Sequence, residues 1–131
     1  MAFCSTVDNI AEIPVSALAY IGDAVYEMQI RLHYLLPPRT PKQYHQLVVS
    51  QVRAEQQAKL LEKLDLTAIE SDLVRRGRNA ASSAPRKVDP HIYQSATGFE
   101  AVIGYLYLTD RDRLDQIFIQ LLSHIDTPAP P

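Results

Sequence analysis

The strongest constraint in this 131-residue chain is the spacing of its apolar residues, which recur every three or four positions. Across residues 18–35 these positions form one continuous stripe when the chain is wound as a helix. No stretch alternates apolar and polar residues with the period of two that a half-buried strand needs. The sequence therefore predicts an all-α fold of about five main helices.

Capping patterns predict where several helices begin. The letters TPKQ at residues 40–43 and TAIE at residues 67–70 both match the capping box. The helix after the first box is expected to continue unbroken through Leu61, and the helix after the second to stop near Gly77. Asp89, followed by proline, is expected to cap a fourth helix. A further apolar stripe predicts the last helix close to the C-terminus.

The length suits one domain with one core. We expect an N-terminal extension over residues 1–13, a helical domain over residues 14–126 and a disordered tail over residues 127–131. The single cysteine, Cys4, has no partner for a disulfide, which favours a reducing compartment. The chain start lacks the features of a secretory signal, and no apolar run is long enough to cross a bilayer. A cytoplasmic protein with no membrane partner is expected.

Two acids stand alone within apolar helices. Asp23 is the one charged residue in a segment that looks buried on all sides, and Glu100 holds the same position in the later helix. Each has a glycine close by, Gly22 and Gly104 respectively. Because small residues let helix backbones approach closely, the two acids are predicted to lie near each other. The first helix is also too apolar for one core alone, so it is expected to contribute to a subunit interface.

Two carboxylates that lie close together repel, and the pKa of one rises unless a cation sits between them. Mg²⁺, with Mn²⁺ as a substitute, binds carboxylates while keeping several waters. Glu27 lies one turn beyond Asp23 on the same face and is expected to hold a water of that metal. The alternative is structural: each acid pairs inside the fold with an arginine, for which Arg31 and Arg53 are candidates. The residue pattern leaves both interpretations open.

A basic segment precedes the helix that carries Glu100. Residues 75–87 hold five basic residues and no acid, although the net charge of the whole chain is −2. Amides, hydroxyls and cationic heads in one loop, expected over residues 77–90, suit a phosphate backbone. The alternative is a solvated charged loop. The candidate phosphate-binding residues are Arg75, Arg76, Arg78, Asn79, Ser82, Arg86 and Lys87. The tyrosines, by their helical spacing, are expected to be mostly packing residues.

The letters IGDAVYE at residues 21–27 and FEAVIGYLYL at residues 99–108 resemble two signature helices of the ribonuclease III family. The forms LAYIGDAVYE, RGRNA and SATGFEA resemble more specifically its short branch, Mini-ribonuclease III, which lacks a double-stranded-RNA-binding domain. The resemblance covers nearly the whole chain. It implies that Asp23 is the catalytic aspartate and Glu100 the metal-binding glutamate.

The resemblance implies an all-α homodimer that hydrolyses both strands of double-stranded RNA with Mg²⁺, leaving 5′-phosphate and 3′-hydroxyl ends. Within the short branch the implied substrate is precursor 23S ribosomal RNA. The chain departs from full-length ribonuclease III at Ala19 and Thr97, where further acids are found, which implies a thinner metal shell. These departures give some support to a rival function, a catalytically inert helical RNA-binding or assembly module.

Overall fold

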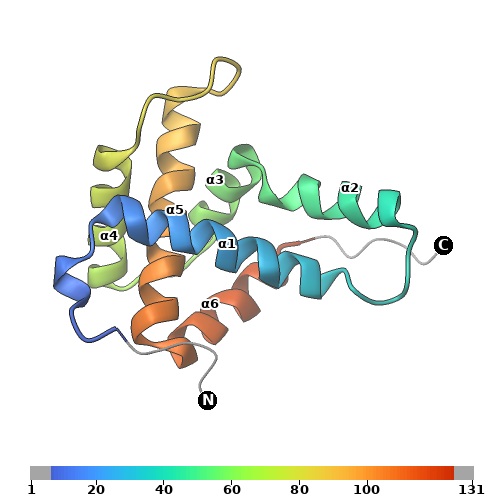
Figure 1. Cartoon of the computed structure of the whole chain (residues 1–131), viewed down its shortest axis with the longest axis horizontal. Coiled ribbons are helices and arrows are strands. Elements are labelled where there is room, and N and C mark those ends of the chain that lie inside the picture. Colours follow the sequence, from blue (N-terminus) through green and yellow to red (C-terminus); the bar gives the residue numbers. More distant parts are fainter. Residues whose placement is uncertain (1–6, 126–131) are drawn as a thin grey trace.

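The computed structural model describes residues 7–125, and within that range every regular element is a helix (Figure 1). The all-α prediction is confirmed. The predicted tail, residues 127–131, and Cys4 lie outside the described residues, and the domain boundaries stay predictions. The elements in chain order are the 3-10 helix η1 (Ile10–Glu12) and the α-helices α1 (Val15–His33), α2 (Pro41–Val52), α3 (Ala54–Glu62), α4 (Ala68–Ala80), α5 (Pro90–Thr109) and α6 (Arg111–Leu122).

Helix α5 is the centre of the fold. It crosses α1, and α3 and α4 lie on either side of it (Figure 1). Phe99 and Ile103 of α5 are fully buried, and the ring of Phe99 meets Tyr26 of α1 edge to face at 5.1 Å between centroids. This aromatic pair adds to the free energy gained by burying both side chains. The buried face of α6 completes the core around the Tyr26 ring, on which the ring of Phe118 stacks.

The helix after the first capping box is not continuous, so this prediction is wrong. Thr40 and Gln43 form the expected capping box at the start of α2. Arg53, however, adopts an extended conformation with φ −68° and ψ 151°, which ends α2 and starts α3. The break lets α3 turn and pack against α5, burying Leu60 in the core. The burial of Leu60 depends on tertiary packing, which the local sequence does not indicate.

The predicted end of the third helix near Gly77 is also wrong. Thr67 and Glu70 form the expected capping box, but α4 continues through Gly77 to Ala80. Gly77 faces Gly98 of α5, and a Cβ atom on Gly77 would lie 2.7 Å from the Gly98 Cα. The glycine therefore serves a close helix crossing and not a helix end. As a result the basic segment is half helical, and the loop is confined to residues 81–89.

The backbones of α1 and α5 approach each other closely where the two helices cross. A Cβ atom on Gly22 would lie 1.7 Å from the carbonyl oxygen of Glu100, and one on Gly104 would lie 1.9 Å from the carbonyl oxygen of Leu18. Real Cβ atoms do not approach backbone oxygens this closely, so only glycine fits at either position. The two backbones thereby hold Asp23 and Glu100 at one place, as the sequence pattern predicted.

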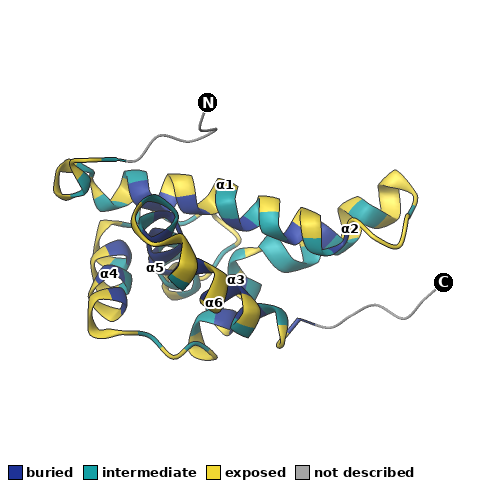
Figure 2. Cartoon of the chain, turned by 90° about the horizontal axis from the view of Figure 1, so that it is seen from below, coloured by how far each residue is buried: buried dark blue, intermediate teal, exposed yellow. Residues whose placement is uncertain are grey.

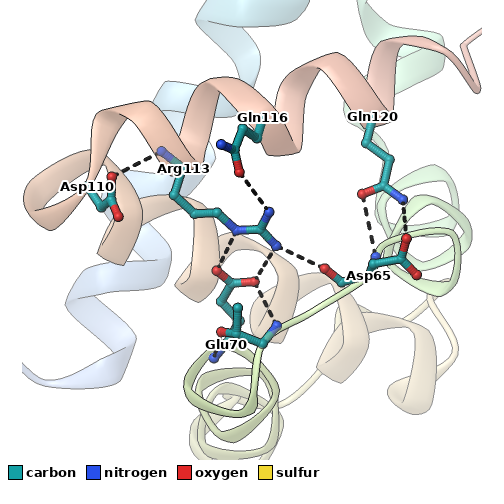
Figure 3. Close-up of polar contacts among 7 residues, drawn as sticks. Asp65, Glu70, Asp110, Arg113, Gln116 and Gln120 are labelled. Carbon is teal, nitrogen blue, oxygen red and sulfur yellow. Dashed lines mark hydrogen bonds and ion pairs between the residues drawn. The ribbon is translucent and has the colours of Figure 1, made fainter.

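A polar cluster joins α4 to α6 (Figure 3). Glu70 of α4 is 3% exposed and accepts two hydrogen bonds of 2.9 Å from Arg113 of α6. Arg113 also donates to the carbonyl oxygen of Asp65, and Gln120 donates to the carbonyl oxygen of Lys63. The hydrogen bonds from Arg113 lower the pKa of Glu70. The charge is therefore buried with its partner, which ties α4 to α6.

The expectation that the segment around Asp23 is buried on all sides is wrong. Asp23 and Ala24 are exposed, and Tyr20 is 80% exposed. Figure 2 shows exposed residues recurring along α1. One side of α1 packs on α5, and the other presents apolar side chains outward. No helix in the described range is long and apolar enough to span a membrane.

Gly104→Ala tests the helix crossing. An alanine in an exposed helix interior gains about 1 kcal/mol over glycine from propensity. At Gly104 we expect the opposite effect. Alanine should lower the free energy of unfolding by about 2–4 kcal/mol, because the new Cβ must push the α1 backbone away from α5. Urea unfolding followed by circular dichroism measures the change. Ser71→Ala on the exposed side of α4 is the control and should be neutral or slightly stabilising. A stable Gly104→Ala variant would show that the crossing can relax.

Candidate active site

A cavity of about 320 Å³ opens where α1, α5 and the end of α4 meet. Its walls combine carboxylates, hydroxyls and small apolar side chains. The lining residues are Ser16, Ala19, Tyr20, Asp23, Ala80, Ala81, Ser82, Tyr93, Thr97 and Glu100. Both lone acids of the sequence therefore face one space, although they are far apart along the chain.

The two carboxylates occupy different environments within this cavity. Asp23 is exposed at the surface of α1, whereas Glu100 is partly buried beside it on α5. Burial, and then the hydrogen bond and repulsion from Asp23, raise the pKa of Glu100 to about 8. A hydrogen bond from Gln57 acts in the opposite direction. Without a cation, the pair therefore keeps a proton close to neutral pH.

The structure does not contain the arginine pairs that would make these acids structural. In the described part of the chain the ion pairs are Glu27–Arg31, Asp72–Arg75 and Glu70–Arg113. None of them includes Asp23 or Glu100. Glu70 is neutralised by Arg113, whereas no ion pair of residues 7–125 neutralises Asp23 or Glu100.

The donor set fits a hard divalent cation. Two carboxylates that repel each other would be stabilised by a cation between them, and Mg²⁺ needs only one or two carboxylates because it keeps waters. Residues 7–125 contain no group of three or more His, Cys, Asp or Glu side chains suited to a metal. The site is thus sparse, as the alanine at position 19 and the threonine at position 97 implied.

Glu27 lies apart from this pair. Its carboxylate forms an ion pair with Arg31 at 2.8 Å, one turn further along α1, and Glu27 is not among the residues that line the cavity. Its predicted contact with a metal-bound water would require that exposed ion pair to open. Exposed pairs of this spacing are weak, so the ion pair itself is a small barrier.

The basic residues divide between α4 and the loop. On α4, Arg75 is paired with Asp72, Arg78 donates to the Ser95 hydroxyl, and Arg76 and Asn79 are exposed. In the loop, Ser82 lines the cavity, with its hydroxyl 3.3 Å from that of Tyr93.

Arg86 lines a second open cavity, of about 560 Å³, that shares Ala81 and Ser82 with the first. Lys87 is exposed. Of the loop residues, Ser82 thus lines the cavity that holds the carboxylate pair, whereas Arg86 lines the adjoining one.

Several residues at the site were not singled out by the sequence. Tyr20 and Tyr93 line the cavity, although the tyrosines were expected mostly to pack. Ser16 adds a hydroxyl about two turns before Asp23, a position that helical spacing from Asp23 could have identified. Gln57 gives no such signal, because it lies in a polar stretch of another helix.

Comparison with known proteins identifies the family. The model of the ribonuclease III domain matches residues 16–111, which is most of the chain. The chain belongs to the ribonuclease III family. Proteins called Mini-ribonuclease 3 are 51% identical over 116 residues in Thermosynechococcus vestitus and 46% identical over 130 residues in Gloeobacter violaceus. The aligned regions cover 87% and 93% of this chain, and 77% and 96% of those relatives.

A crystal structure of a protein from Fusobacterium nucleatum has the same fold. The TM-score is 0.81 at 26% identity, and the match covers 90% of this chain and 98% of that one. Ribonuclease III proteins cleave double-stranded RNA with divalent metal ions, and this chain is an endoribonuclease of that family. The two carboxylates lie within the matched residues.

Glu100→Gln tests whether the ionised carboxylate of Glu100 destabilises the folded protein. Because the pKa of Glu100 is raised to about 8, the folded protein holds a proton between pH 4.5 and 8 that the unfolded chain has lost. Stability therefore falls as pH rises through this range, and the full loss is present above about pH 8. Removing the ionisable group should raise the free energy of unfolding by about 1–3 kcal/mol at pH 9.

The measurement is urea unfolding at pH 5 and pH 9 with EDTA present. At pH 5 the two proteins should have nearly equal stability. Glu62→Gln, at an exposed position of α3, is the control and should change stability at neither pH. If Glu100→Gln is no more stable than wild type at pH 9, ionised Glu100 does not destabilise the folded protein.

Proposed function

We propose that this ribonuclease is a Mg²⁺-dependent homodimer that cleaves both strands of double-stranded RNA and trims the ends of precursor 23S ribosomal RNA. The observation that carries the metal assignment is the Asp23–Glu100 pair, which shares one cavity and forms no ion pair with any residue between 7 and 125. The names of the relatives support the activity but do not give the RNA. The assignment to 23S precursor rests on resemblance to the short branch.

The chain's own residues would share the work as follows. Asp23 and Glu100 would hold Mg²⁺, with Mn²⁺ as a substitute, beside the scissile phosphate. The bound ion supplies a water of lowered pKa and positive charge next to the phosphoryl oxygens. Glu100 must release its proton before it can bind a cation, so metal affinity should rise with pH toward about 8. The products would carry 5′-phosphate and 3′-hydroxyl ends.

RNA would be held by the basic part of α4 and the following loop. Arg76, Arg86 and Lys87 are exposed and would contact flanking phosphates. Because A-form RNA presents phosphates and 2′-hydroxyls rather than readable base edges, recognition should depend mainly on shape. With few cationic contacts, binding should be weak and strongly dependent on salt.

A two-fold dimer would supply the second active site that a double-strand cut needs. The outward side of α1 offers an apolar surface for it, since Tyr20, Met28 and Leu32 are between 53% and 80% exposed. A monomeric protein rarely exposes such a row of large apolar side chains.

The rival candidate is an inert RNA-binding or assembly module. The absence of acids at Ala19 and Thr97 favours it, because both positions line the cavity and neither can bind a metal as a carboxylate would. This candidate predicts RNA binding without Mg²⁺-dependent turnover.

The deciding experiment uses a structured precursor of 23S ribosomal RNA, Mg²⁺ or EDTA, and mapping of new ends. We expect cuts on both strands of a stem with Mg²⁺ and none with EDTA. Asp23→Asn keeps the shape of the side chain and removes its charge, so cleavage should fall at least about a hundredfold. The control is Asp115→Asn on the exposed side of α6, which should cleave like wild type. Near wild-type cleavage by Asp23→Asn would disprove its role as a metal ligand.

Met28→Glu tests the dimer. A charge in the middle of the apolar side of α1 would be buried against its own copy, so we expect monomers by light scattering coupled to gel filtration. Ile119→Glu is the matched control, because Ile119 is 72% exposed on α6, away from α1. It should leave the mass unchanged. If the Met28→Glu protein is still a dimer, the interface does not lie on this side of α1.

A further inference from the structure

The basic residues of this chain are unevenly distributed. The chain has thirteen lysines and arginines and fifteen acids, yet nine of the thirteen basic residues lie in two stretches, 28–54 and 75–87, that contain no acid. The second stretch is the basic segment that the proposed function assigns to RNA. The first stretch, which holds Arg31, Arg39, Lys42 and Arg53, has no role in that function.

One face of α2 presents this first stretch to solvent. Lys42, His45, Gln46 and Val49 lie on a single side of the helix by their spacing, and Arg53, which directly follows α2, continues that side. All five are exposed. Neither Lys42 nor Arg53 forms an ion pair with any residue between 7 and 125. Their charges are therefore available to a partner outside the chain.

The same surface continues onto the end of α1. Between the two helices lies an open hollow of about 200 Å³, lined by Arg31, Pro41, Tyr44, His45 and Val48. The Tyr44 hydroxyl donates a hydrogen bond of 2.5 Å to the carbonyl oxygen of Arg31, which joins α2 to α1 here. Arg31 is paired with Glu27 at 2.8 Å, but both side chains are exposed and such pairs are weak. The Arg31 guanidinium can therefore exchange this partner for an external anion.

We propose that the α2 surface, defined as Arg31, Lys42, His45 and Arg53, binds the phosphate backbone of double-stranded RNA beside the part of the duplex that is cleaved. A nucleic-acid duplex is a dense line of negative charge, and cations that neutralise its phosphates supply affinity without reading sequence. An exposed surface with cations and no acid is complementary to such a line. This inference rests on the proposed function, in which the substrate is double-stranded RNA.

The arrangement of the helices places the two basic stretches on one side of α1. In Figure 1, α2 and the loop before α5 both lie above α1, the helix that carries Asp23, whereas α6 lies below it. A duplex that crosses this side of the molecule can meet both stretches. The side chains of the first stretch would then contact phosphates further from the active site than those met by Arg86 and Lys87.

The alternative is a solvated surface without a partner. Exposed helices of that kind usually carry charges of both signs. Helix α6 of this chain does so, with Arg111, Asp112, Arg113 and Asp115 in its first five positions. Helix α2, in contrast, contains no Asp or Glu between Pro41 and Val52. The absence of acids from α2 therefore favours a polyanion as its partner.

The experiment measures the salt dependence of RNA binding by the double variant Lys42→Gln/Arg53→Gln. The probe is a fluorescent RNA duplex, followed by anisotropy in EDTA so that it is not cleaved. Each lost phosphate contact should reduce the slope of log affinity against log salt by about 0.9, so the double variant should lose about 2. Its affinity at about 100 mM KCl should fall about tenfold or more. Duplexes of unrelated sequence should show the same change, because phosphates carry no sequence information.

Two further variants serve as controls. Lys59→Gln removes an exposed cation from α3, one turn from Glu55 and Glu62, and should keep the wild-type slope and affinity. Arg86→Gln/Lys87→Gln tests the proposed function itself and should lower both. Circular dichroism confirms that each variant is folded. If the Lys42→Gln/Arg53→Gln protein is not folded, the two single variants decide, each with an expected loss of about 0.9 in slope.

The outcomes separate this inference from the proposed function. If the α2 variant binds like wild type while the Arg86→Gln/Lys87→Gln variant loses affinity, the α2 surface does not contact RNA and the inference alone is overturned. An equal loss in Lys59→Gln would also overturn it, because the effect would then come from net charge and not from this surface. If wild-type protein binds no duplex even at low salt, the proposed RNA binding fails, and the inference fails with it.

Discussion

The rest of the structure depends on the contact between the backbones of α1 and α5 at Gly22 and Gly104. These positions leave no room for a Cβ atom, so the helices cross at a separation that other residues would not permit. That crossing brings together Asp23 and Glu100, two acids separated by most of the chain. It also turns the remaining side of α1 outward, because a helix pressed so closely against α5 cannot bury its other side in the same core. The carboxylate pair and the exposed apolar surface thus have one common origin.

The two partly or fully buried glutamates show how the fold treats stability and function differently. Glu70 is matched by Arg113, its pKa is lowered, and it binds α4 to α6 (Figure 3). Glu100 forms no ion pair within residues 7–125, its pKa is raised by burial and by Asp23, and it shares a cavity with that second acid. A charge that the protein neutralises is part of the scaffold. A carboxyl group without a cationic partner, such as that of Glu100, is a candidate for binding a ligand. Strongly shifted pKa values of this kind concentrate at functional sites.

Local and non-local parts of the fold were not equally predictable. The starts of α2, α4 and α5 followed from capping residues, since a cap is decided by atoms within one turn of the chain. The break at Arg53 and the continuation through Gly77 were missed. In both cases packing against α5 overrode the local preference: α3 gained a buried face, and Gly77 gained a close crossing with Gly98.

The sequence alone determined the helical class, the family and the two acids with their glycines, because each of these is written in residue types and short spacings. Only the tertiary structure decided that Asp23 is exposed while Glu100 is partly buried, and that Glu27 forms an ion pair with Arg31. The physical reason is that burial and partnership are properties of pairs of helices. A residue's neighbours along the chain set its helix and its face, but the helix packed against that face sets its charge state.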